Sequence, residues 1–240
     1  MMRLYNGYCF EIMGQIEDNS VDCIITDPPY LMDDGGRGTS DLSKRMKHRR
    51  DTELKALSNF GSEQIHALAS EFMRIQAKLN LMVWCSKNQI RHWLSAIQHI
   101  DPVVLFWGKS NPMPLVNNGL LADVEYALYF RDNGVRCNSN MSNAKRYDIS
   151  SVNVKDKKMY SHPTVKPLII VKRHLSFMTQ KNDVVLDPFM GSGATGVACV
   201  SMGRDFMGIE LDKGHFSTAS ARIRQAEIDK ESEFDFGGEQ

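Results

Sequence analysis

The sequence has no long apolar run, and no segment of it approaches the length of a membrane span. The first residues, 1–7, contain no apolar segment of the signal-peptide type. We therefore expect a cytoplasmic protein without a membrane partner. Its 240 residues are enough for one α/β domain with a large core and too few for two domains of ordinary size.

Cysteine is scarce and irregularly placed. The chain has five cysteines, an odd number, and no two of them form a Cys-x-x-Cys pair. This argues against a disulfide framework and against a zinc site, so we expect reduced, mostly buried thiols and no bound metal. The seven histidines show no metal-like spacing either.

An excess of charge of one sign is also absent, because 29 Lys and Arg residues balance 29 Asp and Glu residues. The total charge therefore does not indicate a nucleic-acid partner, which would have to be met by a local basic patch. Composition alone leaves the function open.

What the chain does contain is an alternation of strand-like and helix-like segments. Helical spacing of apolar residues is found over 65–79, over 90–97 behind a cap at Asn88, and over 168–178 behind Pro167. Short apolar runs typical of buried strands lie at 21–27, 81–85, 103–107, 124–130, 183–186 and 206–211. This alternation predicts an α/β fold, with a mostly parallel, twisted sheet and helices on both faces.

Three segments do not follow this alternation. Residues 31–59 are polar, basic and contain glycine, residues 131–160 are rich in Asn, Ser and Lys, and the last residues are acidic and end in Gly-Gly-Glu-Gln. We expect a single domain over 1–228, with an inserted basic loop at 31–59 and a second insertion at about 111–160, followed by a flexible tail at 229–240.

A glycine-rich turn at 191–196 follows the predicted strand that ends near Asp187. Glycines at such a turn let the backbone approach a cofactor, and the next helix offers free amides. Glu210 ends the following strand, where an acid can accept both hydroxyls of an adenosine ribose. The turn alone would also fit NAD, or no ligand at all.

The order of the segments along the chain argues against NAD. Only one strand and one helix follow the turn, which is too little for the rest of a dinucleotide site. The other strands must then come from the N-terminal side. We therefore expect a Rossmann-like, circularly permuted domain whose cofactor-binding half comes last.

The second motif, Asp27-Pro28-Pro29-Tyr30, ends the predicted strand at 21–27, and parallel sheets place ligands beyond the carboxyl ends of their strands. If the Asp27 carboxylate and the Pro28 carbonyl each accept an N–H of a base amine, the nitrogen lone pair is freed to attack a methyl group in line. Asp27 can also relay the departing proton, and Tyr30 offers a ring face to a base that has left the duplex. Taken alone, the tetrapeptide would also fit a simple strand terminator.

Together these motifs resemble the DNA amino-methyltransferases, in the permuted beta group of adenine-N6 enzymes, where the Asp-Pro-Pro-Tyr motif comes first and the S-adenosylmethionine motif last. The resemblance extends through most of the chain, including residues 162–167 (His-Pro-Thr-Val-Lys-Pro) and the segments that begin at Trp107 and Glu125. It implies S-adenosylmethionine as cofactor, double-stranded DNA as partner, and a target-recognition region at about 111–160.

The resemblance also implies the site residues. Asp27, Pro28, Pro29 and Tyr30 would be catalytic. Asp187 would meet the amino group of the cofactor, Thr164 and Lys166 its carboxylate, and Glu210 its ribose, although a lysine such as Lys166 more often lies on the surface. The full set expected at the cofactor is Cys9, Asp27, His162, Thr164, Lys166, Asp187, Phe189, Gly191, Ser192, Gly193, Thr195, Glu210 and Leu211.

One departure from the family concerns the start of the chain. The family usually has Gly-Asp-Cys there, with the acid touching the cofactor adenine, whereas this sequence has Gly7-Tyr8-Cys9. A tyrosine ring cannot replace that carboxylate. We therefore expect altered adenine contacts and a lowered affinity for the cofactor.

Basic residues are expected to neutralise DNA phosphates without reading the sequence. For the basic stretch 44–50, which follows Tyr30 closely in the sequence, a solvated helix face or loop is the alternative. The expected phosphate contacts are Lys44, Arg45, Lys47, Arg49 and Arg50. Contacts with base edges are expected instead from residues 111–160, where Asn138, Asn140, Asn143, Lys145 and Arg146 have suitable donors and acceptors.

Two rival functions stay open. A cytosine-N4 methyltransferase performs the same chemistry, but its motif more often begins with Ser or Thr, so Asp27 favours adenine. A non-catalytic DNA-binding protein that keeps the cofactor pocket is the second rival, and Tyr8 favours it. RNA or protein-amide methylation is disfavoured, since those relatives commonly have Asn in place of Asp27. The sequence leaves open the recognition site, the oligomeric state, a homodimer included, and any restriction endonuclease partner.

Overall fold

The computed structural model describes residues 1–30, 60–112, 123–138, 145–150 and 166–236, with side chains as far as Ser232. The basic stretch 44–50 and the residues His162 and Thr164 lie outside these ranges.

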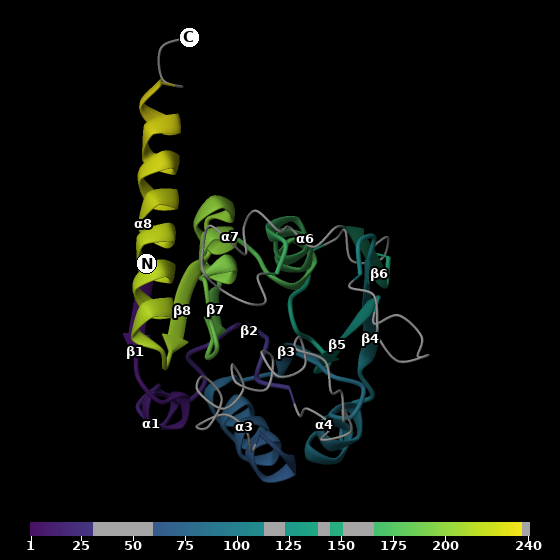
Figure 1. The fold of residues 1–240 in the computed structure, drawn as a ribbon. Coiled ribbons are helices and arrows are strands. Elements are labelled where there is room, and N and C mark those ends of the chain that lie inside the picture. Colours follow the sequence, from purple (N-terminus) through teal and green to yellow (C-terminus); the bar gives the residue numbers. More distant parts are fainter. Residues whose placement is uncertain (31–59, 113–122, 139–144, 151–165, 237–240) are drawn as a thin grey trace, which may run out of the picture.

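A sheet of eight strands runs through the described part of the chain, in the order β1-β8-β7-β2-β3-β5-β4-β6 (Figure 1). β5 is antiparallel to both of its neighbours, and the other neighbouring pairs are parallel. The strands are β1 (Met2–Asn6), β2 (Cys23–Thr26), β3 (Asn80–Cys85), β4 (Val103–Lys109), β5 (Val124–Arg131), β6 (Tyr147–Ser150), β7 (Val184–Asp187) and β8 (Asp205–Glu210).

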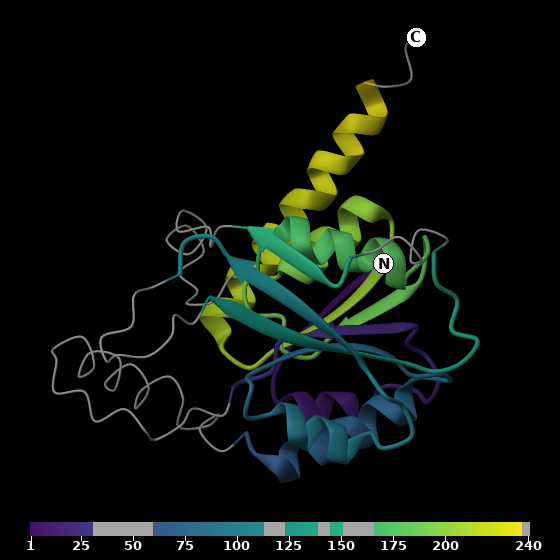
Figure 2. The ribbon, with the colours of Figure 1, turned by 90° about the vertical axis from the view of Figure 1, so that its right-hand side faces the viewer.

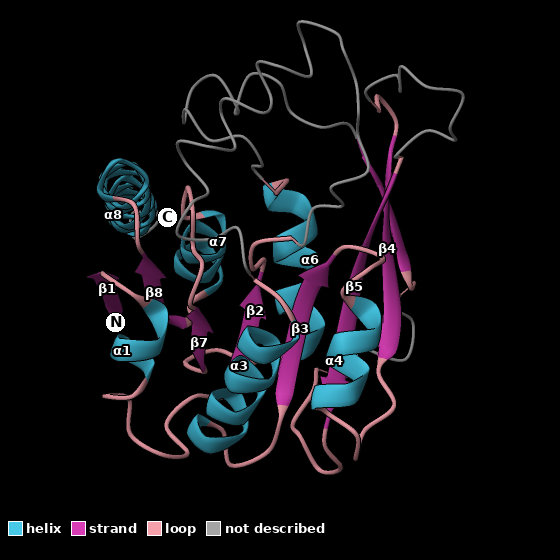
Figure 3. Cartoon of the chain, turned by 60° about the horizontal axis from the view of Figure 1, so that its bottom comes forward, coloured by secondary structure: helices cyan, strands magenta, loops and turns pink. Residues whose placement is uncertain are grey.

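Helices cover both faces of this sheet, as Figures 1 and 3 show. One face carries α1 (Cys9–Met13), α3 (Ser62–Ile75) and α4 (Ile90–Ala96). The other carries α6 (Leu168–Met178), α7 (Ala194–Met202) and the first part of α8 (Lys213–Phe236). The predicted fold class is confirmed, with one antiparallel strand in a mostly parallel sheet.

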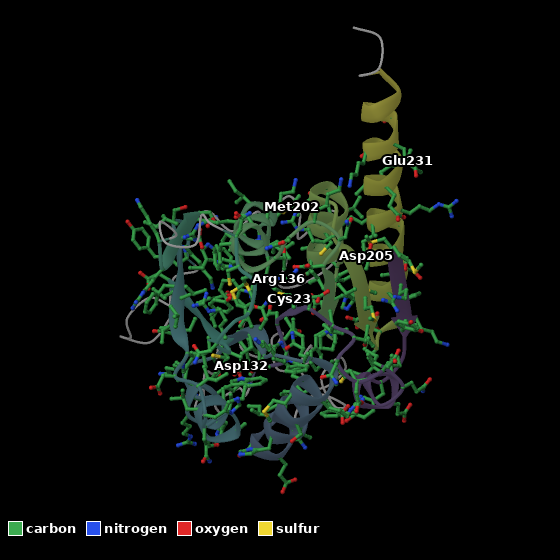
Figure 4. The ribbon with its side chains drawn as sticks, turned by 180° about the vertical axis from the view of Figure 1, so that it is seen from behind. Cys23, Asp132, Arg136, Met202, Asp205 and Glu231 are labelled. Carbon is green, nitrogen blue, oxygen red and sulfur yellow. The ribbon has the colours of Figure 1, made fainter. Side chains whose placement is uncertain are left out.

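The sheet separates two apolar cores because successive side chains of a strand point to opposite faces. In β3, Met82 and Trp84 pack into the core beneath α6 and α7, whereas Leu81 and Val83 pack into the core beneath α3 and α4. Figure 4 places Cys23 of β2 near the middle of the molecule, and its side chain is fully buried. Each large apolar side chain buried in this way stabilises the fold by about 1.5–3 kcal/mol.

All six predicted strands form, with ends within two residues of those expected. Two details of the predicted helices were wrong. The helix expected over 65–79 ends at Ile75, and Leu79 instead leads into β3, where its amide donates to Asp132. The expected cap at Asn88 is Gln89, whose side chain closes the preceding turn by accepting from Ser86.

Leu94 is another correction within α4. The expected apolar face included Ile90, Trp93, Leu94 and Ile97, but Leu94 is 43% exposed, while Trp93 and Ile97 are buried. α4 has only seven residues, so its buried face is narrower than an ideal apolar stripe.

Part of the segment that was expected to form a tail is helical. A tail was expected from Asp229 onward, but α8 continues to Phe236. Its second half projects away from the sheet (Figures 2 and 4), and Gln225 there donates a side-chain hydrogen bond to Asp229. Within the described residues, no helix has the combined length and apolarity that a membrane crossing requires.

Candidate active site

The two predicted motifs meet at the carboxyl ends of β2 and β7, which are neighbours in the sheet. From β7 the chain crosses through α7 to β8 on one side, and from β2 it crosses through α3 to β3 on the other. Open α/β sheets bind ligands at such a switch point. A hydrogen bond of 2.9 Å from Thr26 Oγ1 to Asp187 Oδ1 ties the two strand ends together.

Asp187 is a buried acid, with 4% of its surface exposed. It accepts hydrogen bonds from the Thr26 hydroxyl, the Phe189 amide and, at 2.7 Å, the Thr195 hydroxyl. Burial raises the pKa of Asp187 to about 7, because these neutral donors only partly offset the loss of water. No Lys or Arg in the described ranges forms an ion pair with it, so the site favours a ligand that brings a cation.

The glycine turn follows Asp187 directly. Gly193 adopts a left-handed conformation with φ 78° at the start of α7, which glycine tolerates and most residues do not. Arg222 of α8 donates to both the carbonyl and the hydroxyl of Ser192, at 3.1 and 3.3 Å. These two hydrogen bonds from Arg222 hold the turn against α8.

Glu210, at the end of β8, is held by two backbone amides. Its Oε2 accepts from Gly191 at 3.0 Å and its Oε1 from Asp212 at 2.8 Å. Burial raises the pKa of Glu210, and the amides oppose that shift. Each oxygen keeps a further lone pair, which fits the recognition of two hydroxyl groups.

The N-terminal residues reach the same place from the other end of the chain. β1 pairs with β8, and the Gly7 amide donates to the Glu210 carbonyl at 3.0 Å. Cys9 is buried, and burial raises the pKa of its thiol to about 12. Tyr8 is 43% exposed, with its ring 5.4 Å from that of Phe10.

Two other residues of the expected cofactor set lie at this edge. The ring of Phe189 meets that of Phe60 edge to face at 5.5 Å. Leu211 follows Glu210 and is 41% exposed. The structure therefore brings Cys9, Asp187, Phe189, the glycine turn, Glu210 and Leu211 together around the ends of β7 and β8.

Asp27 lies just past β2, beside this group. Its Oδ2 accepts from the Lys166 ammonium at 2.7 Å. Its Oδ1 is buried, and no hydrogen bond from a described residue reaches it. A buried acceptor without a partner is costly and indicates a place for a donor from a ligand.

Lys166 was expected on the cofactor carboxylate, but here it contacts carboxylates of the protein. Besides Asp27, it donates to Glu125 Oε2 of β5 at 2.7 Å, and it lies 3.4 Å from the Tyr30 hydroxyl. Only 9% of its surface is exposed, so it is no ordinary surface lysine.

The two prolines present their carbonyls differently. Gln89, fully buried at the start of α4, donates to the Pro29 carbonyl at 2.9 Å. Among the hydrogen bonds between described residues, none reaches the Pro28 carbonyl. One side of the motif is therefore fixed while the other can accept a hydrogen bond.

Lys145 and Arg146, expected to bind DNA, are exposed and precede β6. The Lys145 ammonium lies 5.6 Å from the centre of the Tyr147 ring, and the Arg146 carbonyl accepts from Phe106 of β4. Because β6 runs parallel to β4, both residues lie towards the amino ends of these strands, away from Asp27. The structure does not bring them next to the motif.

Sequence reasoning missed Thr26, Gln89 and Glu125 as site residues. Thr26 and Glu125 lie within strands, and Gln89 caps a short helix. The one available signal was the charge of Glu125 at the start of an apolar strand.

Comparisons with known proteins agree with this geometry. A family model, N6_N4_Mtase, described as DNA methylase, matches residues 21–221. The type II methyltransferase M2.MboI of Moraxella bovis is 26% identical over 93% of this chain and 88% of that protein. M2.DpnII of Streptococcus pneumoniae is 27% identical over 92% of this chain and 89% of that protein.

Two solved structures share the architecture. The complex of M1.HpyAVI with SAM is 28% identical, with a TM-score of 0.66 over 92% of this chain and 100% of that chain. The cytosine-N4-specific PvuII DNA methyltransferase is 15% identical, with a TM-score of 0.71 over 92% of this chain and 86% of that chain. The second likeness shows the fold alone.

Fold and site define an α/β transferase domain, in which a cofactor half and a catalytic half meet at one switch point. Since the family match spans both halves, the chain belongs to the N6/N4 family of DNA methylases and is an S-adenosylmethionine-dependent DNA methyltransferase. The described residues fit that cofactor, because the buried Asp187 suits its ammonium group and Glu210 suits its ribose.

Proposed function

We propose that this protein methylates the N6 amine of adenine at specific sites in double-stranded DNA, after the base has left the duplex. One observation carries the proposal: Asp27 Oδ1 is buried beside the cofactor half of the site and accepts no hydrogen bond within the described part of the chain. An exocyclic amine is a donor of the kind that this oxygen lacks.

The chain's own residues would act by position and charge. Asp27 Oδ1 accepts one amine hydrogen and the Pro28 carbonyl accepts the other, which directs the nitrogen lone pair away from the ring. Asp27 can then take up the proton that the nitrogen must lose. Gln89 keeps the neighbouring Pro29 carbonyl in place, and Tyr30 stacks on the extruded base.

S-adenosylmethionine supplies the methyl group as an electrophile. We assign its ammonium group to Asp187, its ribose to Glu210, and its approach to the backbone at the turn formed by Gly191, Ser192 and Gly193. Thr195 and Thr26 orient the Asp187 carboxylate through their hydroxyls. Cys9, Phe189 and Leu211 would line the adenosine side, and His162, Thr164 and Lys166 the methionine side.

Adenine is preferred to cytosine because the motif begins with Asp27 rather than Ser or Thr. A carboxylate can accept a hydrogen bond from the amine and then act as a general base for its proton during the reaction, whereas a hydroxyl is a much weaker base. The amines of both bases can make the same two hydrogen bonds, so the product must be identified directly.

The test uses radiolabelled S-adenosylmethionine and unmodified genomic DNA amplified by PCR. We expect wild-type protein to produce N6-methyladenine, identified by mass spectrometry after digestion to nucleosides. Asp27→Ala should lose at least about 100-fold in transfer rate, measured at saturating cofactor because Asp27 also belongs to the set expected at the cofactor. Asp18→Ala, an exposed acid paired with Arg74, is the matched control and should behave as wild type.

Two results would contradict the proposal. N4-methylcytosine without N6-methyladenine would assign the enzyme to cytosine. Cofactor binding by the wild type without transfer to any of the amplified DNA would favour a binding protein that retains the cofactor pocket.

A further inference from the structure

Four side chains of alternating charge form a row beside the catalytic motif. Lys109 of β4 contacts Glu125 Oε1 at 2.7 Å, Glu125 Oε2 contacts Lys166 at 2.7 Å, and Lys166 contacts Asp27 Oδ2 at 2.7 Å. Lys109, Glu125 and Asp27 are each about one-fifth exposed, and Lys166 less. The row therefore connects Asp27 of the motif with β5, which carries Glu125, and β4, which carries Lys109.

The surroundings of Lys166 leave its ammonium few hydrogen-bond partners. The rings of Trp84, Tyr30 and Trp107 lie 4.8, 5.8 and 6.0 Å from Nζ. Ring faces attract a cation but fix its hydrogen bonds only weakly. The ammonium makes short hydrogen bonds of 2.7 Å to the carboxylates of Asp27 and Glu125 and a longer one of 3.4 Å to the Tyr30 hydroxyl, so the two carboxylates dominate its direction.

The electrostatics agree with this geometry. Burial acts to lower the pKa of Lys166, but Asp27 and Glu125 outweigh it and raise that pKa. For Glu125, burial acts to raise the pKa, but Lys166 and Lys109 outweigh it and lower that pKa. Both groups are thus held in their charged forms.

This sharing matters for Asp27. With Glu125 absent, the ammonium would have a single carboxylate partner and could bridge both of its oxygens. With Glu125 present, one N–H is committed to Glu125 and the ammonium stays on Oδ2. The other oxygen, Oδ1, is then left without a hydrogen bond from any side chain or amide that the structure describes.

We propose that Glu125 is a positioning residue for methyl transfer, because it holds the Lys166 ammonium on Asp27 Oδ2 and so keeps Asp27 Oδ1 free for the amine of the target base. This inference rests on the proposed role of Asp27. In this proposal Lys166 contacts Asp27 and Glu125 rather than the cofactor carboxylate. Lys109 holds Glu125 in place through its ion pair with Oε1.

A double-mutant cycle tests whether Glu125 acts through Lys166. We expect Glu125→Gln to lower kcat about 10- to 100-fold on the amplified DNA, with the KM for S-adenosylmethionine changed less than about threefold. In a Lys166→Met background, Glu125→Gln should cause no further loss of kcat. Equal losses in both backgrounds would overturn the proposal.

The control is Glu71→Gln, which removes a carboxylate paired with Arg74 on α3, away from the site, and should leave kcat unchanged. Thermal unfolding is followed for every variant. If Glu125→Gln does not fold, Glu125→Asp takes its place in the cycle, since it keeps the charge but withdraws the carboxylate from Lys166.

A second measurement does not depend on activity. The charged or titratable groups facing Lys166 are Asp27, Tyr30, Glu125 and Cys85, with Lys109 behind Glu125. Since Glu125 helps to raise the pKa of Lys166, Glu125→Gln should lower the midpoint at which the Lys166 side chain titrates by NMR. An unmoved midpoint would overturn the proposal even if the wild type methylates DNA. A wild type without transfer would instead reject the proposed function, and with it the role of Glu125 in transfer, whatever the midpoint.

Discussion

Asp187 is a buried carboxyl group without a cationic partner among the described side chains, which makes its charge sensitive to pH near neutrality. Burial raises its pKa to about 7. The folded chain therefore holds the Asp187 proton more tightly than the unfolded chain does, so protonation of Asp187 stabilises the ligand-free fold at low pH. This contribution to the free energy of unfolding is lost as the pH rises through about 7. A cation bound at the ionised Asp187 would restore the lost stability.

Cofactor binding should follow the same titration in the opposite sense. We expect the affinity for S-adenosylmethionine to fall as the pH drops below about 7, approaching tenfold per pH unit, because the protonated acid no longer attracts an ammonium group. Calorimetry at a series of pH values from about 5.5 to about 7.5 measures this affinity. Asp187→Asn should bind weakly at every pH, Asp229→Asn on α8 should keep the wild-type profile, and a flat wild-type profile would contradict the assignment.

Sequence reasoning found those site residues that follow a recognisable strand. Asp27, Asp187 and Glu210 each end an apolar run, so their place at one sheet edge could be predicted. Glu125 could not be found in this way, because its role depends on the register that sets it opposite Trp107 and on a lysine distant in sequence. Its local pattern is that of any charged residue at the start of a strand.

At the scale of single elements, α1 begins without a side-chain cap. Tyr8 occupies the N-cap position in an extended conformation and makes no cap hydrogen bond. A short polar side chain at this position can accept from a free amide of the first turn, and a negative charge there also suits the helix dipole.

Tyr8→Asp should therefore stabilise the protein by about 1 kcal/mol, measured by urea unfolding. By the family resemblance, it should also tighten S-adenosylmethionine binding, since an acid usually stands here. Tyr8→Ala removes the same ring without adding a cap and is the control. Equal stability of the two variants would show that this end of α1 needs no cap.

Gly196 of α7 packs closely against β8 and α8. A β-carbon there would lie 2.8 Å from Phe206 Cε1 of β8 and 2.8 Å from Ile223 Cγ1 of α8. We expect Gly196→Ala to destabilise the fold by about 1–3 kcal/mol through overpacking, although alanine favours helix. Gly14→Ala is the control, because its β-carbon would come no closer than 3.4 Å to another atom. Equal melting temperatures of the two variants would contradict this account.

The elements that sequence reasoning missed are short and depend on distant partners. β1 takes its register from β8 at the other end of the chain, and β6 has four residues placed by β4. α1 has five residues, too few to show helical periodicity. The longer or more apolar elements were predictable, because the pattern that signals them is also what buries them.

At the scale of the whole molecule, a protein with no net charge must bind a polyanion through local basic groups. The residues proposed for this are the basic stretch 44–50 and the pair Lys145 and Arg146. A duplex extends well beyond one extruded base, so phosphates can be contacted at a distance from Asp27. Such contacts release counterions and give DNA binding a measurable dependence on salt.

We expect Lys44→Ala with Arg45→Ala to weaken DNA binding for every sequence tested and to make the plot of log K against log salt shallower by about 2, since each phosphate contact contributes about 0.9. Lys145→Ala with Arg146→Ala should act in the same way, because the structure places this pair away from Asp27 and we therefore expect it to contact phosphates rather than base edges. The control is Lys78→Ala with Lys181→Ala, two exposed lysines that precede β3 and β7 at the amino ends of these strands, opposite to Asp27. Lys145 and Arg146 also lie towards the amino ends of their strands, but beside β4 and β6. An unchanged slope in either test pair would remove that pair from the interface, whereas a loss confined to one DNA sequence would mean that the pair reads bases rather than phosphates.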